Sequence, residues 1–175
     1  DSVFERFYVT SLGQMLLAKA QVGTLLTFTR VRIGDGTLPG GQSIEALTDL
    51  ISPIKYLPIA SLSSRDQSAI ITSQFSNSDL DTSFWFREIG LYATDPDNGE
   101  ILYAYANAGD KADHIPAAST SPVDFTFSFN LSVGNVENVT VVADPSLIFM
   151  TQEDFAEITE DEIDGLWDSA SGTGA

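Results

Sequence analysis

The chain has a single histidine, His114, in the segment Asp113–Pro116. A serine or cysteine nucleophile needs a base within hydrogen-bond reach, and that base is usually a histidine. No cysteine occurs in the chain, and no Gly-x-Ser-x-Gly turn accompanies His114. The segment around it is the most loop-like part of the sequence. We therefore predict an exposed loop histidine, and we assign no catalytic residue.

Two pairs of carboxylates have a spacing that acid–base hydrolysis could use: Asp79 with Asp81, and Asp95 with Asp97. That chemistry requires one carboxyl group buried enough to keep its proton near neutral pH. Both pairs lie in polar turn sequence beside asparagine and serine, where water would solvate them. The pattern favours turns, and it makes a hydrolase the least favoured class of protein.

The segment Asp95–Glu100 also has the composition of a calcium-binding loop. An EF-hand loop places its glycine at position six and a glutamate at position twelve. Counted from Asp95, Gly99 occupies position five, so the register is wrong. Gly34-Asp-Gly36 has neither of the glycine spacings that bind nucleotide phosphates. The sequence therefore predicts no metal ion and no cofactor.

The aromatic run Phe84-Trp-Phe86 could form a platform on which a sugar stacks. Side chains alternate between the two faces of a strand, so Phe84 and Phe86 share one face and Trp85 points to the other. We favour a place for Trp85 in the core or at a subunit interface, and contact with a ligand is the alternative.

The composition and charge of the chain limit the classes of molecule that it is expected to bind. Of its 175 residues, 43% are hydrophobic, which is enough for a packed core. The 25 acidic and 8 basic residues give a formal net charge of −17. Because such a surface repels phosphate groups, we expect no nucleic acid and no membrane as partners. No apolar stretch approaches the length that spans a bilayer.

One helix and a series of strands are expected to position these residues. Apolar residues at helical spacing predict a helix over residues 11–22, with a capping box between Ser11 and Gln14 and an end at Gly23. The His114 segment forms a loop of about 14 residues. Period-two alternation predicts the strands, with a slip near Arg30 and a hairpin turn at 95–99. Their expected ranges are 4–8, 26–33, 54–62, 68–76, 84–94, 101–106, 123–133 and 138–143, with a short helix over 43–50.

These elements predict an α+β fold: a mostly antiparallel, sandwich-like β domain with a packed N-terminal helix and a short C-terminal helical tail. We divide the chain into a domain of residues 1–150 and an acidic tail of residues 151–175. Between Glu153 and Asp168 the tail has eight acidic residues and no basic one. Its apolar stripe needs a surface to cover it, because a lone short helix is marginal in water. We favour a partner protein over the chain's own domain, with a docking stripe of Ile163, Leu166 and Trp167.

Three stretches together resemble the N-terminal attachment domain of phage tail fibres, the tail-collar fibre family. The resemblance covers roughly residues 7–155, with the second stretch the most specific. The stretches are Leu12-Gly-Gln-Met-Leu-Leu-Ala-Lys19 through Phe28-Thr-Arg-Val-Arg-Ile-Gly-Asp-Gly36; Phe86-Arg-Glu-Ile-Gly-Leu-Tyr92 with Ile101-Leu-Tyr-Ala-Tyr-Ala-Asn107; and Val133-Gly-Asn-Val-Glu-Asn-Val-Thr-Val141 through Met150-Thr-Gln-Glu-Asp154.

The resemblance implies a structural virion component that is not an enzyme. We expect a homotrimeric adaptor in host attachment, bound to the baseplate of a contractile or related tail and to the distal fibre or another tail protein. Its place would be the virion tail, after assembly in the host cytoplasm. Fibres of this family normally extend much further, so we expect no receptor-binding tip here. A carbohydrate-binding module is the alternative.

The specific stretch contains two adjacent charges, Arg87 and Glu88, which point to opposite sides of a strand. One of them must point inward, and a buried charge is tolerated only when it is paired. We therefore assign Trp85, Arg87 and Glu88 to subunit or baseplate contacts. An exposed charged edge is the alternative for the two charges.

Overall fold

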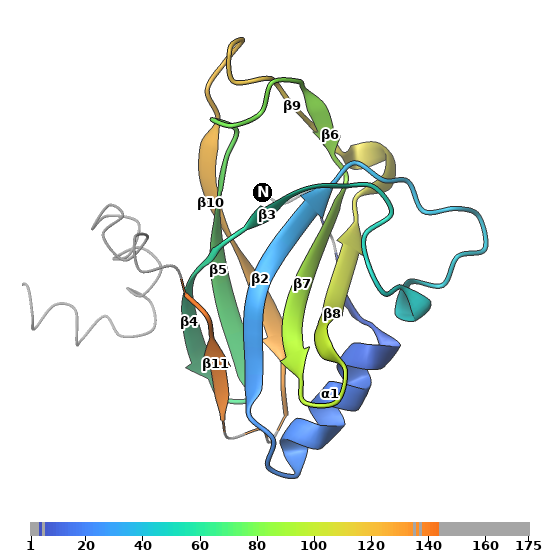
Figure 1. Cartoon of the computed structure of the whole chain (residues 1–175), viewed down its shortest axis with the longest axis vertical. Helices are drawn as coiled ribbons and strands as arrows, with labels where there is room; N and C mark the ends of the chain where they lie inside the picture. Colours follow the sequence, from blue (N-terminus) through green and yellow to red (C-terminus); the bar gives the residue numbers. More distant parts are fainter. Residues whose placement is uncertain (1–3, 5, 135, 137, 144–175) are drawn as a thin grey trace, which may run out of the picture. The chain divides into compact units, whose positions relative to one another are not determined.

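Two β-sheets face each other and share one hydrophobic core (Figure 1). The computed structural model describes residues 4, 6–134, 136 and 138–143. Strands in this part are antiparallel except for β11, which runs parallel to β2. The prediction of mostly antiparallel strands with one N-terminal α-helix is therefore confirmed. The elements are β1 (Tyr8–Val9), α1 (Ser11–Gln21), β2 (Leu26–Gly34), η1 (Ile44–Ala46), β3 (Pro53–Leu57), β4 (Ile59–Arg65), β5 (Ser68–Ser76), β6 (Phe84–Phe86), β7 (Glu88–Asp95), β8 (Gly99–Asn107), η2 (Gly109–Lys111), β9 (Asp113–Ile115), β10 (Asp124–Ser132) and β11 (Val139–Val141).

The larger sheet has the strand order β1-β8-β7-β2-β11, and β3 pairs with β2 beside β11. The smaller sheet has the order β10-β5-β4. Between β3 and β4 the chain crosses from the larger sheet to the smaller one, so a nearly continuous strand seals that side of the sandwich (Figure 1). The opposite side, between β8 and β10, has no such crossing strand among the described residues.

The slip predicted near Arg30 is a β-bulge. The pairing of β2 with β7 shifts register between Phe28 and Arg30, so one extra residue is inserted. The bulge changes the alternation, which lets both Phe28 and Val31 reach the core with none of their surface exposed. It also leaves Arg30 and Arg32 on the opposite face of the sheet, where the site described below is built.

Helix α1 begins at Ser11 as predicted, but its N-cap lies one residue before the predicted cap. Its N-cap is Thr10, whose hydroxyl oxygen accepts a hydrogen bond from the Gly13 N–H at 3.0 Å. The same hydroxyl donates to the carbonyl oxygen of Leu102 on β8, which fixes the helix start to the sheet edge. Ser11 is exposed and does not cap the helix. The predicted capping box was wrong because only Thr10 serves the helix and the sheet together.

Replacing Thr10 by alanine should lower the free energy of unfolding by about 1–2 kcal/mol, since both the cap and the buried bond to Leu102 are lost. Ser11→Ala is the matched control and should change it by less than about 0.5 kcal/mol, because its side chain faces water. Urea unfolding followed by circular dichroism measures both variants. Equal losses would show that Ser11 shares the capping role.

Two other predicted strands are each divided into two in the structure, and one predicted loop contains a strand. Residues 84–94 form β6 and β7, which separate at Arg87 and pair with different neighbours. The predicted His114 loop contains the short strand β9, which pairs with β6. The predicted strand 54–62 spans β3 and β4. The hairpin of β7 and β8 is confirmed, and Gly99 has the positive φ (78°) that its turn requires.

Candidate functional site on the loop-bearing face of the larger sheet

A loop of residues 35–52 lies against the face of the larger sheet that points away from the core. It leaves the end of β2, contains η1 and returns to β3 (Figure 1). Leu47 and Leu50 of this loop are buried and pack in a second, smaller cluster against the sheet. The sheet residues of that cluster are Tyr92, Leu102 and Tyr105. We call this side of the sheet the loop-bearing face.

The side chain of Glu88 fixes the loop to the sheet, and none of its surface is exposed. Its carboxylate oxygens accept hydrogen bonds from the backbone N–H groups of Gly36 (3.1 Å), Ile51 (2.9 Å) and Ser52 (2.7 Å). The hydroxyl group of Tyr105 donates a fourth bond at 2.6 Å. One buried carboxylate thus binds both ends of the loop and the neighbouring strand β8.

Three glycines make room for this arrangement. A Cβ atom on Gly36 would lie 2.6 Å from a carboxylate oxygen of Glu88, and one on Gly34 would lie 2.5 Å from the same oxygen. A Cβ atom on Gly90 would lie 2.6 Å from the side chain of Leu102. Real Cβ contacts are longer than 3.0 Å. Gly34, Gly36 and Gly90 therefore leave the room that the loop and the carboxylate of Glu88 occupy.

Arg87 extends the same attachment to a second loop. Its backbone N–H donates to the carbonyl oxygen of Gly34 at 3.0 Å. Its guanidinium group donates to the carbonyl oxygens of Asp35 (3.3 Å) and Gly109 (2.9 Å). The guanidinium and the Glu88 carboxylate therefore bind different groups, as their opposite directions predicted.

This geometry corrects the assignment of Glu88 to a subunit or baseplate contact. A side chain with no exposed surface and four partners inside its own chain does not reach another protein. The pairing that a buried charge requires is supplied by backbone donors and a tyrosine, not by a neighbouring subunit. The contact assignments of Arg87 and Trp85 stay predictions.

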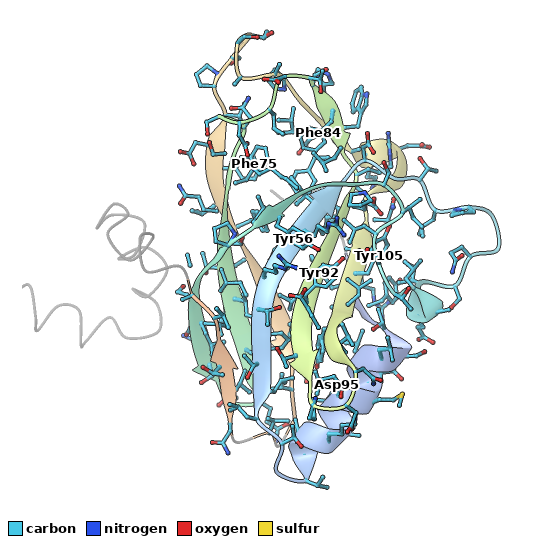
Figure 2. The ribbon with its side chains drawn as sticks, in the orientation of Figure 1. Tyr56, Phe75, Phe84, Tyr92, Asp95 and Tyr105 are labelled. Carbon is cyan, nitrogen blue, oxygen red and sulfur yellow. The ribbon has the colours of Figure 1, made fainter. Side chains whose placement is uncertain are left out.

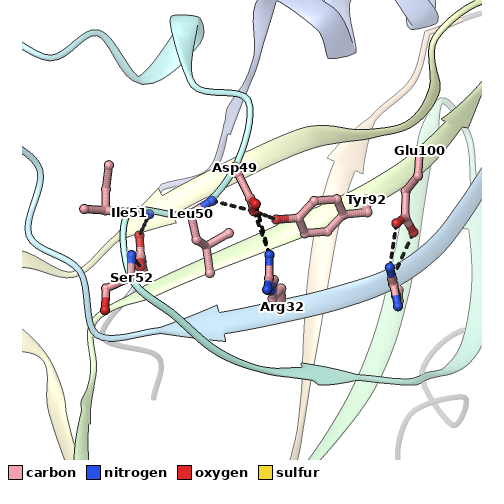
Figure 3. Close-up of polar contacts among 9 residues, drawn as sticks. Arg32, Asp49, Leu50, Ile51, Ser52, Tyr92 and Glu100 are labelled. Atoms are coloured by element: carbon pink, nitrogen blue, oxygen red, sulfur yellow. Dashed lines mark hydrogen bonds and ion pairs between the residues drawn. The ribbon is translucent and has the colours of Figure 1, made fainter.

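A polar triad joins the loop to β2 and β7 (Figure 3). The hydroxyl group of Tyr92 donates to the carboxylate of Asp49, and the guanidinium group of Arg32 binds the same carboxylate at 3.0 Å. Burial, followed by the hydrogen bond to Asp49, raises the pKa of Tyr92 well above its ordinary value. Burial opposes ionisation of Asp49 too, but the bonds from Tyr92, Leu50 and Arg32 outweigh it and lower its pKa.

Beside the triad lies a stack of arginine and tyrosine side chains. The guanidinium carbon of Arg30 lies 3.5 Å from the ring centroid of Tyr56, and that of Arg32 lies 4.4 Å from it. Arg30 also binds both carboxylate oxygens of Glu100, at 3.0 and 2.8 Å. Figure 2 shows Tyr56 and Tyr92 close together on this face, and their ring centroids are 6.1 Å apart. Tyr56 remains partly exposed, so the stack is part of the surface.

Trp85 is 49% exposed on β6. Its predicted separation from Phe84 and Phe86 is confirmed, because both phenylalanines are buried. The ring of His114, on the paired strand β9, lies 4.9 Å from the ring of Trp85 in an edge-on arrangement. His114 is exposed as predicted, but it belongs to a strand and not to a loop. Together the two rings form an exposed aromatic pair.

The two carboxylate pairs have the turn roles that were predicted, with one difference. Asp79 is exposed and binds Lys55 at 2.7 Å. Asp95 is only 1% exposed, whereas the sequence suggested that water would solvate it. Its carboxylate accepts the Asp97 N–H at 2.8 Å and the Lys19 ammonium group at 2.8 Å, which ties the hairpin turn to α1. The Lys19 hydrogen bond holds the pKa of Asp95 below its usual range, so this carboxyl group does not retain a proton for acid catalysis.

In the ranges 6–134 and 138–143, no group of three His, Asp or Glu side chains has the spacing of a metal site. No helix of the described part is both long and apolar enough to cross a membrane. The docking stripe Ile163, Leu166 and Trp167 lies outside the described residues, as does the predicted helical tail.

The sequence did not reveal the loop-bearing face. The sequence predicts no strand between residues 33 and 54, but nothing in its pattern shows which surface this segment covers. Arg30 and Arg32 were treated only as polar positions of a strand. One signal could have indicated this face. Arg30 and Arg32 are two residues apart on one strand, and the strand of Tyr92 pairs with it, so side chains on the same face of the two strands are in contact.

Comparison with known proteins identifies one family. The family model described as phage tail-collar fibre protein, N-terminal, matches residues 5–153. Neither the curated proteins nor the solved structures gave a significant match. The matched range contains the 35–52 loop, its Glu88 anchor and the exposed Trp85.

Proposed function

Because the chain belongs to the phage tail-collar fibre family, matched through that family's N-terminal domain, it is a component of a phage tail fibre, and we propose that it acts there as an attachment adaptor. In this proposal three copies bind the baseplate of a contractile or related tail. Residues 151–175 then join the copies to the distal fibre or to another tail protein through Ile163, Leu166 and Trp167. The role is structural and needs no enzymatic activity.

The observation that carries this proposal is the exposure of Trp85. A tryptophan that is 49% exposed on a strand fixed by β9 offers a large, rigid apolar contact. Tryptophan, tyrosine and arginine are the residues enriched at the energetic centres of protein interfaces. The stack of Arg30, Arg32 and Tyr56 supplies the other two types on the loop-bearing face. Both surfaces are held in place before any partner arrives, which lowers the entropy cost of binding.

The test is incorporation of the chain into tails. In a phage that lacks the native chain, Trp85→Ala should reduce the amount found in purified particles at least tenfold, measured by quantitative immunoblot. Met15→Ala is the matched control, because Met15 is an apolar side chain on α1 with a similar exposure of 52%. Analytical ultracentrifugation of the chain with its baseplate partner should give three copies of 18.8 kDa per complex. Equal incorporation of both variants would contradict the role of Trp85.

A carbohydrate-binding role is the second candidate, and the exposed pair of Trp85 and His114 favours it. Aromatic rings that face water are the surfaces on which sugars stack. A glycan array probed with the isolated chain distinguishes the two functions. Specific glycan binding that disappears in Trp85→Ala would support receptor recognition over attachment.

A further inference from the structure

A cavity of about 510 Å³ opens among aromatic side chains of the β domain. Its volume lies within the range of ligand and peptide sites. The lining includes six phenylalanines: Phe4, Phe7, Phe86, Phe125, Phe127 and Phe129. Asp113 is the one charged residue among the described residues that line it. Phe125 and Phe127 are only partly buried, so this part of the core is incompletely covered.

Strand β10, which supplies half of these phenylalanines, has a free edge. It pairs with β5 along all of Asp124–Ser132, and no other strand of the described residues pairs with its second edge. Antiparallel pairing directs alternate N–H and C=O groups to each side, so a row of them faces away from β5. Edges of this kind are usually protected by charges, proline or bulges. β10 has one charged residue, Asp124, no proline, and an unshifted register with β5.

The cavity and the free edge coincide. Residues 125–129 all line the cavity, including Thr126 and Ser128, whose side chains point away from the core face. A cavity that borders five consecutive residues of β10, and not only those whose side chains face the core, is consistent with a position along the strand edge. Phe7 packs 4.7 Å from Phe129 and Phe4 packs 5.2 Å from Phe86, measured between ring centroids. The segment before β1 therefore forms part of the wall of the same cavity.

We infer that an extended segment of a neighbouring tail protein adds to the free edge of β10 as an extra strand and places its alternate apolar side chains among these phenylalanines. In this mode of recognition, main-chain hydrogen bonds supply affinity and pockets for every second side chain supply specificity. That the partner is a tail protein rests on the proposed function. That a strand can add to the free edge of β10 rests only on the geometry of the edge and the cavity.

Charge selects the kind of segment. The chain has a net charge of −17, and the exposed Asp124 begins the edge strand in the same alternating set as Thr126 and Ser128, which points away from the core face. Opposite charge steers and orients association, and like charge opposes it. The added strand should therefore have lysine or arginine at the positions that point away from the cavity. A second copy of this chain has the same negative charge and is the less favoured occupant.

The probe is a synthetic nine-residue peptide in which valine and lysine alternate, labelled for fluorescence anisotropy and titrated with the full chain. Two peptides serve as controls: one groups the same valines and lysines in blocks, and one alternates valine with glutamate. Both should bind at least tenfold more weakly than the alternating lysine peptide. Hydrogen exchange should show the β10 amides that face away from β5 slowing at least tenfold only with that peptide.

Two variants of the chain test the location. Phe127→Ala enlarges the cavity and should weaken peptide binding at least fivefold. Because that variant removes core contacts, Ser128→Lys provides a second measurement. Ser128 is exposed, and Ser128→Lys and Ser128→Glu both lose the hydrogen bond of its side chain to Thr72 at 3.1 Å. Because that loss is common to them, opposite effects report the charge: Ser128→Lys should weaken binding of the lysine peptide at least fivefold, and Ser128→Glu should strengthen it.

Three results would overturn the inference: equal binding of the alternating and blocked peptides, Ser128 variants without effect, or protection in the free chain of those β10 amides that face away from β5. Protection that falls on dilution would show a second copy at the edge, and protection independent of concentration would show a cover within the chain. A chain that binds no peptide yet still enters tails through Trp85 refutes this inference alone. A chain that binds the peptide but never enters tails refutes the proposed function alone.

Discussion

Replacing Glu88 by alanine should lower the free energy of unfolding by roughly 3–5 kcal/mol. Four donors lose their acceptor: the N–H groups of Gly36, Ile51 and Ser52 and the hydroxyl group of Tyr105. A buried donor without a partner costs about 1–3 kcal/mol, and local rearrangement or entering water recovers part of the sum. Urea unfolding of the isolated chain gives the value, and amides of residues 36–52 should exchange faster in the folded variant.

Two further variants serve as references for this measurement: Glu88→Gln, which keeps the shape of the side chain, and Glu45→Ala, which removes an exposed carboxylate from the same loop. The amide of Glu88→Gln keeps the shape but turns one acceptor into a donor that faces N–H groups, so we expect a loss of about 1–3 kcal/mol. Glu45 is exposed in the same loop, and its removal should change stability by less than about 0.5 kcal/mol. If Glu88→Ala left the isolated chain as stable as before but blocked its assembly into tails, the carboxylate would be an interface residue after all.

Local patterns determined the parts of the fold that were predicted correctly. The strand 68–76 was placed with its observed bounds, and the 95–99 turn was placed where β7 meets β8. In both cases the signal is local, because turn residues and alternation act over a few neighbours. The face of β10 that contains Phe125, Phe127 and Phe129 followed from the same alternation. The division of the chain at residue 150 stays a prediction, since residues 144–175 lie outside the described part.

Long-range contacts determined what could not be predicted. The break at Arg87 changes the phase of the alternation, because Phe84 and Phe86 face the core before it and Ile89 and Leu91 face the core after it. Residues on both sides of Arg87 are apolar, so the composition of 84–94 fits one long strand as well as two short ones. Glu88 looks like a surface charge until the two ends of the 35–52 loop, at Gly36 and Ser52, and Tyr105 of β8 are brought to it. Thr10 and Ser11 are chemically equivalent caps, and only the carbonyl group of Leu102 distinguishes them. In each case the deciding partner is distant in the sequence.

Gly13→Ala should destabilise the chain although it improves the intrinsic helix propensity. In an isolated helix this change stabilises by about 1 kcal/mol. Here a Cβ atom would lie 2.9 Å from the side chain of Val9 and even closer to the backbone carbonyl oxygen of Tyr103. A backbone oxygen of β8 cannot move without disturbing the sheet, so α1 must shift and strain its cap at Thr10. We expect a net loss of roughly 2–3 kcal/mol, within the range of overpacking in a tight contact.

The sign of this effect separates two explanations of the glycine. If Gly13 only loosened α1, alanine would raise the urea midpoint and leave hydrogen exchange of β8 unchanged. If it permits close contact between α1 and the edge of β8, alanine lowers the midpoint and accelerates exchange at Leu102 and Tyr103. Ser11→Ala, in the first turn of the same helix, reports the propensity gain without the contact. A rise in stability of about 1 kcal/mol for Gly13→Ala, beyond the change of less than about 0.5 kcal/mol expected for Ser11→Ala, would show that the helix does not need this close approach.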